Sequence, residues 1–109
     1  MAEDIGVAQE FVTTVVDLST ATSQVVTAGP CVVRGTSVNT LMSAHTAALN
    51  DSAGVEKAVI PASSPVGYEK NHYDTTMNGI TVASNASGTG EIAIVWKPFS
   101  TPLQFTPQG

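Results

Sequence analysis

The chain has 109 residues, the length of one small domain, and 42% of them are hydrophobic, which excludes wholesale disorder. Only 12% of the residues are charged, and the net charge is −5. The four basic residues are scattered along the sequence, which argues against binding to nucleic acid or to an anionic membrane. The missing charge is replaced by hydroxyl groups, with 14 Thr and 10 Ser. Because hydroxyl side chains lose little entropy when they are covered, this composition favours a domain that packs against other chains.

The start of the chain and its single cysteine narrow the class of protein further. Cys31 is the only cysteine, so the chain forms no internal disulfide. The N-terminus is acidic and has no basic-then-apolar leader, and we therefore expect no secretory signal. The sequence contains no run of about 18 apolar residues, so we expect no membrane-spanning helix. A secreted β-domain, whose surface is also rich in hydroxyl groups, is the alternative interpretation of the composition.

Short runs rich in β-branched and aromatic residues alternate with turn residues along the whole chain. This spacing predicts an all-β domain, a small antiparallel β-sandwich for which a jelly roll is one variant. Residues 91–97 are the clearest strand, because Ile92, Ile94 and Trp96 fall on one face at a period of two. The predicted strands, in chain order, are 11–18, 24–28, 31–35, 38–42, the hairpin arms 43–49 and 55–60, then 68–77, 80–83 and 91–97.

Turn-forming residues set the expected boundaries between these strands. Gly29-Pro30 and Asn78-Gly79 are strong turn signals, and we expect each pair to separate two strands. Gly35 lies inside a strand pattern and predicts a bulge or a bend. Residues 50–54 are the expected loop of the hairpin.

The two ends of the chain differ from its middle. We expect residues 1–10 to form a flexible N-terminal arm, residues 11–97 to form the β-sandwich domain, and residues 98–109 to form a C-terminal arm that prolines keep extended. The C-terminal arm nevertheless carries three large apolar side chains, which predict contact with a neighbouring subunit or with the domain's own core. The candidate interface residues are Phe11, Val15, Phe99, Leu103 and Phe105.

The residues that could carry chemistry are few and dispersed. Cys31 lies in an apolar strand pattern, which indicates a buried and inert thiol rather than a nucleophile. His72 and Asp74 are two residues apart and would share a strand face, but His45 is remote in the sequence, and the set has no recognised metal-ligand spacing. We therefore expect no catalytic residue, no cofactor and no metal, and hence a protein that is not an enzyme.

Two further motifs have a structural and a functional interpretation. Residues 88–90 (Gly-Thr-Gly) lack the lysine and the following helix of a phosphate-binding loop, so we expect a hairpin loop there. Carbohydrate binding would need exposed aromatic rings, for which Tyr68, Tyr73 and Trp96 are the candidates. Trp96 alternates with isoleucines and is expected to lie in the core.

Several segments between residues 29 and 97 together carry a family resemblance. They are 29–35 (GPCVVRG), 38–40 (VNT), 43–46 (SAHT), 60–64 (IPASS) with Gly67, 78–82 (NGITV) and 92–97 (IAIVWK). These segments resemble those of small structural proteins of tailed bacteriophages, of the capsid decoration (cement) type. The resemblance implies a small β-domain without catalytic residues that binds the major capsid protein on the outside of the assembled head, commonly as a homotrimer.

On this resemblance, the protein is made in the host cytoplasm and resides in the virion, on the capsid exterior. Its expected mechanism is the bridging of neighbouring capsomers, because a protein that binds only the assembled shell stabilises it by mass action. Several weak contacts from one oligomer add up through effective concentration. A tail, neck or head-fibre component is the alternative structural role, and a small glycan-binding module is the alternative from another class.

Overall fold

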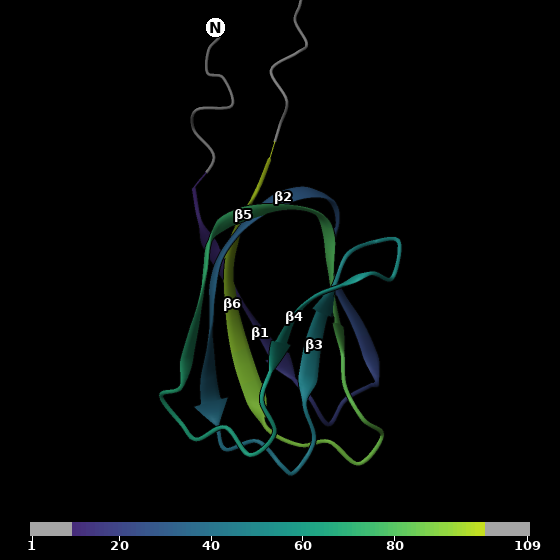
Figure 1. Ribbon diagram of the computed structural model, residues 1–109, viewed down its shortest axis with the longest axis vertical. Coiled ribbons are helices and arrows are strands. Elements are labelled where there is room, and N and C mark those ends of the chain that lie inside the picture. The colour runs from purple at the N-terminus through teal and green to yellow at the C-terminus, as the bar shows by residue number, and fades with distance from the viewer. Residues whose placement is uncertain (1–9, 100–109) are drawn as a thin grey trace, which may run out of the picture.

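The computed structural model describes residues 10–99, which form an all-β domain. Six strands make one antiparallel sheet in the order β1-β6-β2-β5-β3-β4 (Figure 1). The predicted all-β class is thus confirmed, whereas the expected arms fall almost entirely outside the described residues. The described part of the chain contains no helix with the length and hydropathy needed to cross a membrane. The strands are β1 (Val12–Asp17), β2 (Ser23–Thr40), β3 (Ala47–Asn50), β4 (Glu56–Ile60), β5 (Glu69–Ala83) and β6 (Glu91–Pro98).

The two longest strands, β2 and β5, arch over one end of the molecule and fold the sheet back on itself (Figure 1). Before the bend, β2 pairs with the end of β5, with Gln24 opposite Val82. After the bend, β2 lies between β5 and β6, and Thr36 is opposite both Lys70 and Ile94. One half of the sheet therefore contains β1 and β6, and the other contains β3 and β4. This arrangement is consistent with the predicted sandwich, and the jelly-roll variant stays a prediction.

The predicted turns at Gly29-Pro30 and Asn78-Gly79 are wrong. Both pairs lie inside continuous strands and mark the bend of β2 and of β5. The register of β2 against β5 shifts between Val25 and Thr27 and again before Pro30. A bulge leaves residues unpaired and bends a strand, and proline is tolerated there because it has no N–H to contribute to the ladder. The same residue types that end a strand in a turn therefore bend it here.

The other local predictions hold more closely. A register shift between Val33 and Gly35 confirms the bulge expected at Gly35. The hairpin is confirmed, since β3 pairs with β4, although its first arm begins at Ala47 rather than at residue 43. The strands expected at both ends of the domain are present as β1 and β6, and they pair with each other.

The loop of the β3–β4 hairpin fixes the bend. The Ser52 N–H donates to the Asn78 carbonyl at 2.9 Å, and the Ser52 hydroxyl donates to the Ala28 carbonyl at 2.9 Å. The Asp51 carboxylate holds the loop itself by accepting the N–H groups of Ala53 and Val55 at 3.0 and 2.9 Å. One loop therefore joins β2 to β5 at the point where both strands change direction.

A single core fills the space between the two halves of the sheet. Cys31 belongs to it and is fully buried, as predicted. Burial raises the pKa of the Cys31 thiol, which keeps the group protonated at neutral pH and disfavours nucleophilic attack. Each fully buried aliphatic side chain stabilises the fold by about 1.5–3 kcal/mol relative to exposure. The largest of these are Leu49, Ile60, Ile80, Ile92, Ile94, Val33, Val38 and Val82.

Candidate interaction site

The structure places three of the five candidate interface residues on or near the surface. Val15 lies in the middle of β1 with 55% of its surface exposed, and Phe99 follows β6 with 41% exposed. Phe11 is half-buried just before β1. The start of β1 and the end of β6 lie at the same end of the molecule (Figure 1), so Phe11 and Phe99 belong to one region. Leu103 and Phe105 lie outside the described residues.

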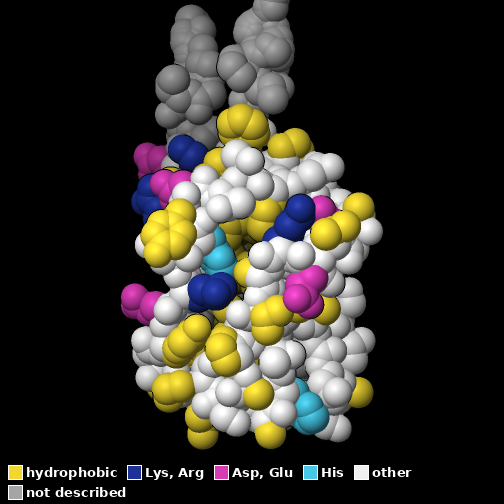
Figure 2. All heavy atoms as spheres, viewed as in Figure 1, with side chains coloured by type: hydrophobic (Ala, Val, Ile, Leu, Met, Phe, Trp, Pro, Cys, Tyr) yellow, Lys and Arg dark blue, Asp and Glu magenta, His cyan; other side chains and the backbone are white. Residues whose placement is uncertain are grey.

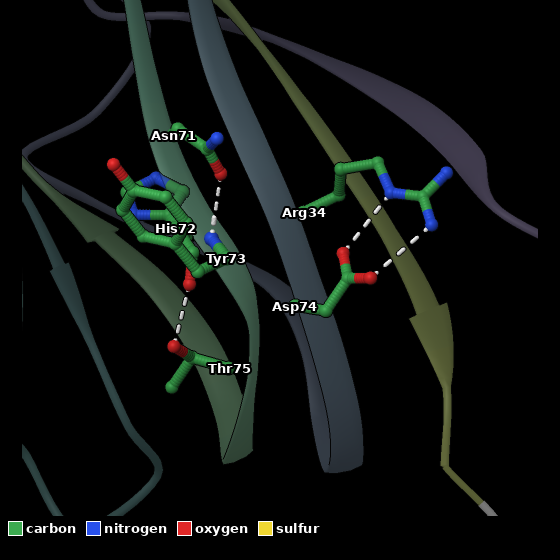
Figure 3. Close-up of polar contacts among 6 residues, drawn as sticks. All are labelled: Arg34, Asn71, His72, Tyr73, Asp74 and Thr75. Atoms are coloured by element: carbon green, nitrogen blue, oxygen red, sulfur yellow. Dashed lines mark hydrogen bonds and ion pairs between the residues drawn. The ribbon is translucent and has the colours of Figure 1, made fainter.

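Charged side chains gather around the Phe11 ring. The guanidinium carbon of Arg34 lies 3.7 Å from the ring centroid, and Nζ of Lys97 lies 4.9 Å from it, both within the range of a cation–π contact. Arg34 also donates two hydrogen bonds to Asp74, at 3.0 and 3.2 Å (Figure 3). These bonds lower the pKa of Asp74, so the carboxylate stays ionised. Figure 2 shows charged and hydrophobic side chains side by side at this end of the visible face.

Asp74 reaches Arg34 because β5 carries an irregular bulge, in which three residues lie opposite one residue of β2. Between the pairs Val33↔Thr75 and Gly35↔Asn71, only Arg34 lies on β2, whereas residues 72–74 lie on β5. Tyr73 and Asp74 both have left-handed backbones, with φ of 57° and 54°. This conformation is unfavourable for a residue with a Cβ, and for tyrosine it is uncommon. Backbone strain of this kind clusters at functional positions, which makes the bulge a candidate site.

Side-chain hydrogen bonds hold the bulge in place. The Asn71 side-chain oxygen accepts the Tyr73 N–H at 2.7 Å, and the Thr75 hydroxyl donates to the His72 carbonyl at 2.5 Å (Figure 3). Nε2 of His72 lies 2.9 Å from the Thr36 hydroxyl, in hydrogen-bond contact. The result is a fixed protrusion on which Tyr73 is 82% exposed. We call Phe11, Arg34, Asp74, Tyr73, Lys97 and Phe99 the terminal surface. Contacts link Phe11, Arg34, Lys97 and Asp74, Phe99 is the last described residue, and Tyr73 is included because it precedes Asp74 in the bulge.

The expectation that His72 and Asp74 share a strand face is wrong. The left-handed residues break the alternation of period two, so Asp74 pairs with Arg34 at the surface while His72 turns toward Thr36 and is half-buried. Within residues 10–99, no three metal-ligating side chains come together. Only the side chains of Asn71 and Asp74, which tolerate or support left-handed turns, hint at the bulge in the sequence.

The three candidate aromatic residues for glycan binding have different surroundings. Tyr68 and Trp96 pack against the core, and the Trp96 indole N–H donates to the Thr14 hydroxyl at 2.9 Å. Tyr73 alone of the three presents its ring to solvent. Beside the bulge lies a shallow hollow of about 410 Å³, which is lined by Gly35, Ser37, Lys70, Asn71 and Val95 among others.

The two edges of the sheet differ in how they are protected. β4, at one edge, carries Glu56 and Lys57 and pairs irregularly with β3. Charges and bulges are common devices that keep an edge strand from pairing with another chain. β1, at the other edge, has the sequence VTTVVD, a regular register against β6 and a single charge at its end. An edge strand of this composition is a template for a further strand.

Replacement of Tyr73 tests the backbone of the bulge. Asparagine adopts the left-handed conformation more readily than tyrosine, so Tyr73→Asn should raise the free energy of unfolding by about 0.5–1 kcal/mol. A β-branched residue adopts it least readily, and Tyr73→Val should lower the free energy of unfolding by about 1–2 kcal/mol. Urea denaturation of the two variants measures both values. Equal values for the two would contradict a left-handed Tyr73.

His72 makes stability depend on pH. Burial, assisted by the nearby charge of Lys70, lowers the pKa of His72 below its usual value of 6.5. As pH falls, the unfolded chain therefore takes up the proton before the folded chain does, so stability is complete above about pH 6.5 and declines below it. We expect the melting temperature to fall between about pH 7 and 5. The fall should be smaller in His72→Gln, whereas it should persist in the control His45→Gln.

Comparisons with known protein families, with curated proteins and with solved structures find no match to this chain. Its functional interpretation therefore depends on the residues and contacts described above.

Proposed function

We propose that this chain is a structural protein of a phage particle, a capsid decoration (cement) protein that binds the outside of the head. The observation that carries the proposal is the terminal surface. Tyr73, Arg34 and the two phenylalanines belong to the residue types that are enriched at protein interfaces, where aromatic rings and arginine dominate the binding energy. An exposed tyrosine held on a fixed bulge loses little conformational freedom when a partner covers it.

The composition of the rest of the surface supports the same role. Hydroxyl side chains outnumber charged ones, so a broad contact with a capsid would desolvate few charges. Leu103 and Phe105 follow Phe99 in the sequence and add two large apolar side chains of the kind that bind partner proteins. A copy that contacts two capsomers at once binds only the assembled lattice and stabilises it by mass action.

The test is co-sedimentation of the purified protein with assembled phage capsids. We expect binding that weakens by about tenfold or more in Tyr73→Ala and in Lys97→Ala, since each removes a side chain from the terminal surface. Lys57→Ala is the matched control, because Lys57 lies on the opposite edge strand and pairs with Asp51 at 3.7 Å.

Two outcomes would count against the proposal. Wild-type protein that does not sediment with capsids would refute the decoration role. Gold labelling of phage particles at the tail, neck or head fibres, rather than over the head, would favour the alternative structural role.

A glycan-binding module is the second candidate, and the exposed ring of Tyr73 is the observation that favours it. A planar aromatic face beside polar Asn71 and the adjoining hollow could receive a sugar ring, which presents both apolar C–H and polar O–H groups. A glycan array should then show binding that disappears in Tyr73→Ala. Binding that survives this substitution would count against the site.

A further inference from the structure

We infer that two copies of this chain pair edge to edge through their β1 strands, antiparallel, and join their two sheets into one across a twofold axis. This inference concerns the free protein in solution, and it goes beyond the proposed capsid contact without depending on it. The two contacts share Phe11, Arg34 and Lys97, which border the paired edge. Tyr73 of the terminal surface lies on β5, which is not a neighbour of β1.

Among the strands of residues 10–99, β1 pairs only with β6, and its other edge faces no strand. The Leu18 N–H donates to the Gly90 carbonyl at 2.9 Å, which continues the β1–β6 ladder. In an antiparallel ladder the N–H and C=O groups of alternate residues point to the same side. Those of Thr13 and Val15 therefore point away from β6. The Asp17 carbonyl confirms this alternation, because it accepts the Gln24 side-chain amide at 2.7 Å on the free side.

The free edge sets the register of the pairing. In a continuous sheet, residues opposite one another must lie on the same face, and the outward N–H and C=O groups must meet. Both conditions are satisfied when Thr13 of each copy lies opposite Val15 of the other copy. Thr14 then lies on the twofold axis, facing its counterpart in the second copy.

Charge complementarity identifies a second copy as the occupant of this edge. In the antiparallel register, Asp17 of one copy lies opposite Phe11 of the other, the ring that Arg34 and Lys97 approach to 3.7 and 4.9 Å. The Ser19 N–H and hydroxyl fix the Asp17 carboxylate through hydrogen bonds of 2.9 and 2.6 Å. Each end of the paired strands thus places an acid beside bases, whereas a parallel pairing would place the two Asp17 residues together.

The protected edge explains why this assembly closes at two copies. β4 presents Glu56 and Lys57, so a copy has one edge available for pairing rather than two. A twofold contact that uses the same strand of both copies leaves no further edge open. We therefore expect a dimer and no filament.

Sedimentation equilibrium over a range of protein concentrations tests the dimer. Thr13→Pro removes an N–H that faces the free edge and leaves the ladder with β6 intact, and Val15→Lys places a charge on the edge. Each should raise the dimer Kd by about tenfold or more without unfolding the monomer. Val55→Lys is the matched control, since Val55 is exposed to nearly the same degree as Val15 (52% and 55%) but lies in the hairpin loop.

Disulfide formation tests the register, because the sole native cysteine, Cys31, is fully buried and does not compete. The two Thr14 Cα atoms would lie about 4.5 Å apart across the axis, as in pairs without mutual hydrogen bonds. Thr14→Cys should therefore form disulfide-linked dimers under mild oxidation. Val12→Cys should not form them, because Val12 of one copy lies four residues along the strand from Val12 of the other copy, a distance of about 13 Å between the two positions. Linking of both variants would indicate a parallel pairing.

Three results would overturn the inference: a wild-type protein that stays monomeric at millimolar concentration, a trimer, or a dimer that Val15→Lys leaves unchanged. Capsid binding is measured separately with Tyr73→Ala, because Tyr73 lies on β5 and not beside β1, whereas Lys97→Ala would affect both contacts. A protein that dimerises but does not bind capsids would refute the proposed function and would not contradict the inferred dimer.

Discussion

Gly79→Ala is expected to lower the free energy of unfolding by about 2–5 kcal/mol, because it acts on the bend of β5 in two ways. Gly79 has φ of 98°, a conformation that strains any residue with a Cβ. A Cβ at this position would also overlap the Ser52 hydroxyl, which donates to the Ala28 carbonyl. Thermal or urea unfolding of the purified variant measures the loss.

Gly54→Ala separates the two causes. Gly54 also has a left-handed φ, of 84°, but a Cβ there would meet nothing within 4 Å. The loss at Gly79 should therefore exceed the loss at Gly54 by the contribution of the clash. Ser52→Ala in the Gly79→Ala background should recover part of that excess, although it removes the bond to Ala28. Equal losses at the two glycines would show that Ser52 is free to move aside.

The bend also shows why part of the fold could not be predicted from the sequence. The strands at the two ends of the domain and the β3–β4 hairpin follow from local patterns and are present, although the first hairpin arm begins four residues later than expected. Gly29-Pro30 and Asn78-Gly79 carry the same local preferences whether the chain turns back or only bends. The choice is made by β2 and β5, which pair on both sides of the bend through residues distant in the sequence.

The bulge at residues 72–74 could not be predicted from the sequence for a related reason. Alternation predicts one face for His72 and Asp74, and beyond the turn-forming types of Asn71 and Asp74 the sequence carries no sign that Tyr73 adopts a left-handed backbone. The stability of the bulge depends on the bond between Asp74 and Arg34 of the neighbouring strand, two residues that are 40 positions apart in the sequence. Long-range ion pairs of this kind cannot be inferred before the register of β2 against β5 is known.

The candidate site was partly predictable. Large apolar residues next to the domain boundaries, such as Phe11 and Phe99, could be selected because nothing in the sequence supplied them with partners. That Lys97 and Arg34 would gather around Phe11 depends on β1 pairing with β6 in the register that sets Val12 opposite Trp96. The sequence thus indicated the apolar part of the terminal surface and left out its charges.

The largest effect of a core substitution is expected at Leu49. This residue is fully buried, and it is the middle of the three residues that join β3 to β5. Leu49→Ala should lower the free energy of unfolding by about 2–5 kcal/mol, because it removes buried surface and leaves a cavity. Leu41→Ala is the matched control, since Leu41 is 60% exposed and should change stability by no more than about 0.5 kcal/mol.

Hydrogen exchange in the Leu49→Ala variant shows which strands lose protection together with the hairpin. The hairpin holds the bend through Ser52, which donates to Asn78 of β5 and to Ala28 of β2. If hairpin and bend open as one unit, exchange should rise both in β4 and near Asn78. If exchange rises in β4 alone, the hairpin opens by itself and the bend is held by the pairing of β2 with β5. Because β1 and β6 lie in the other half of the sheet, their exchange should change least, which would leave the proposed dimer edge intact in this variant.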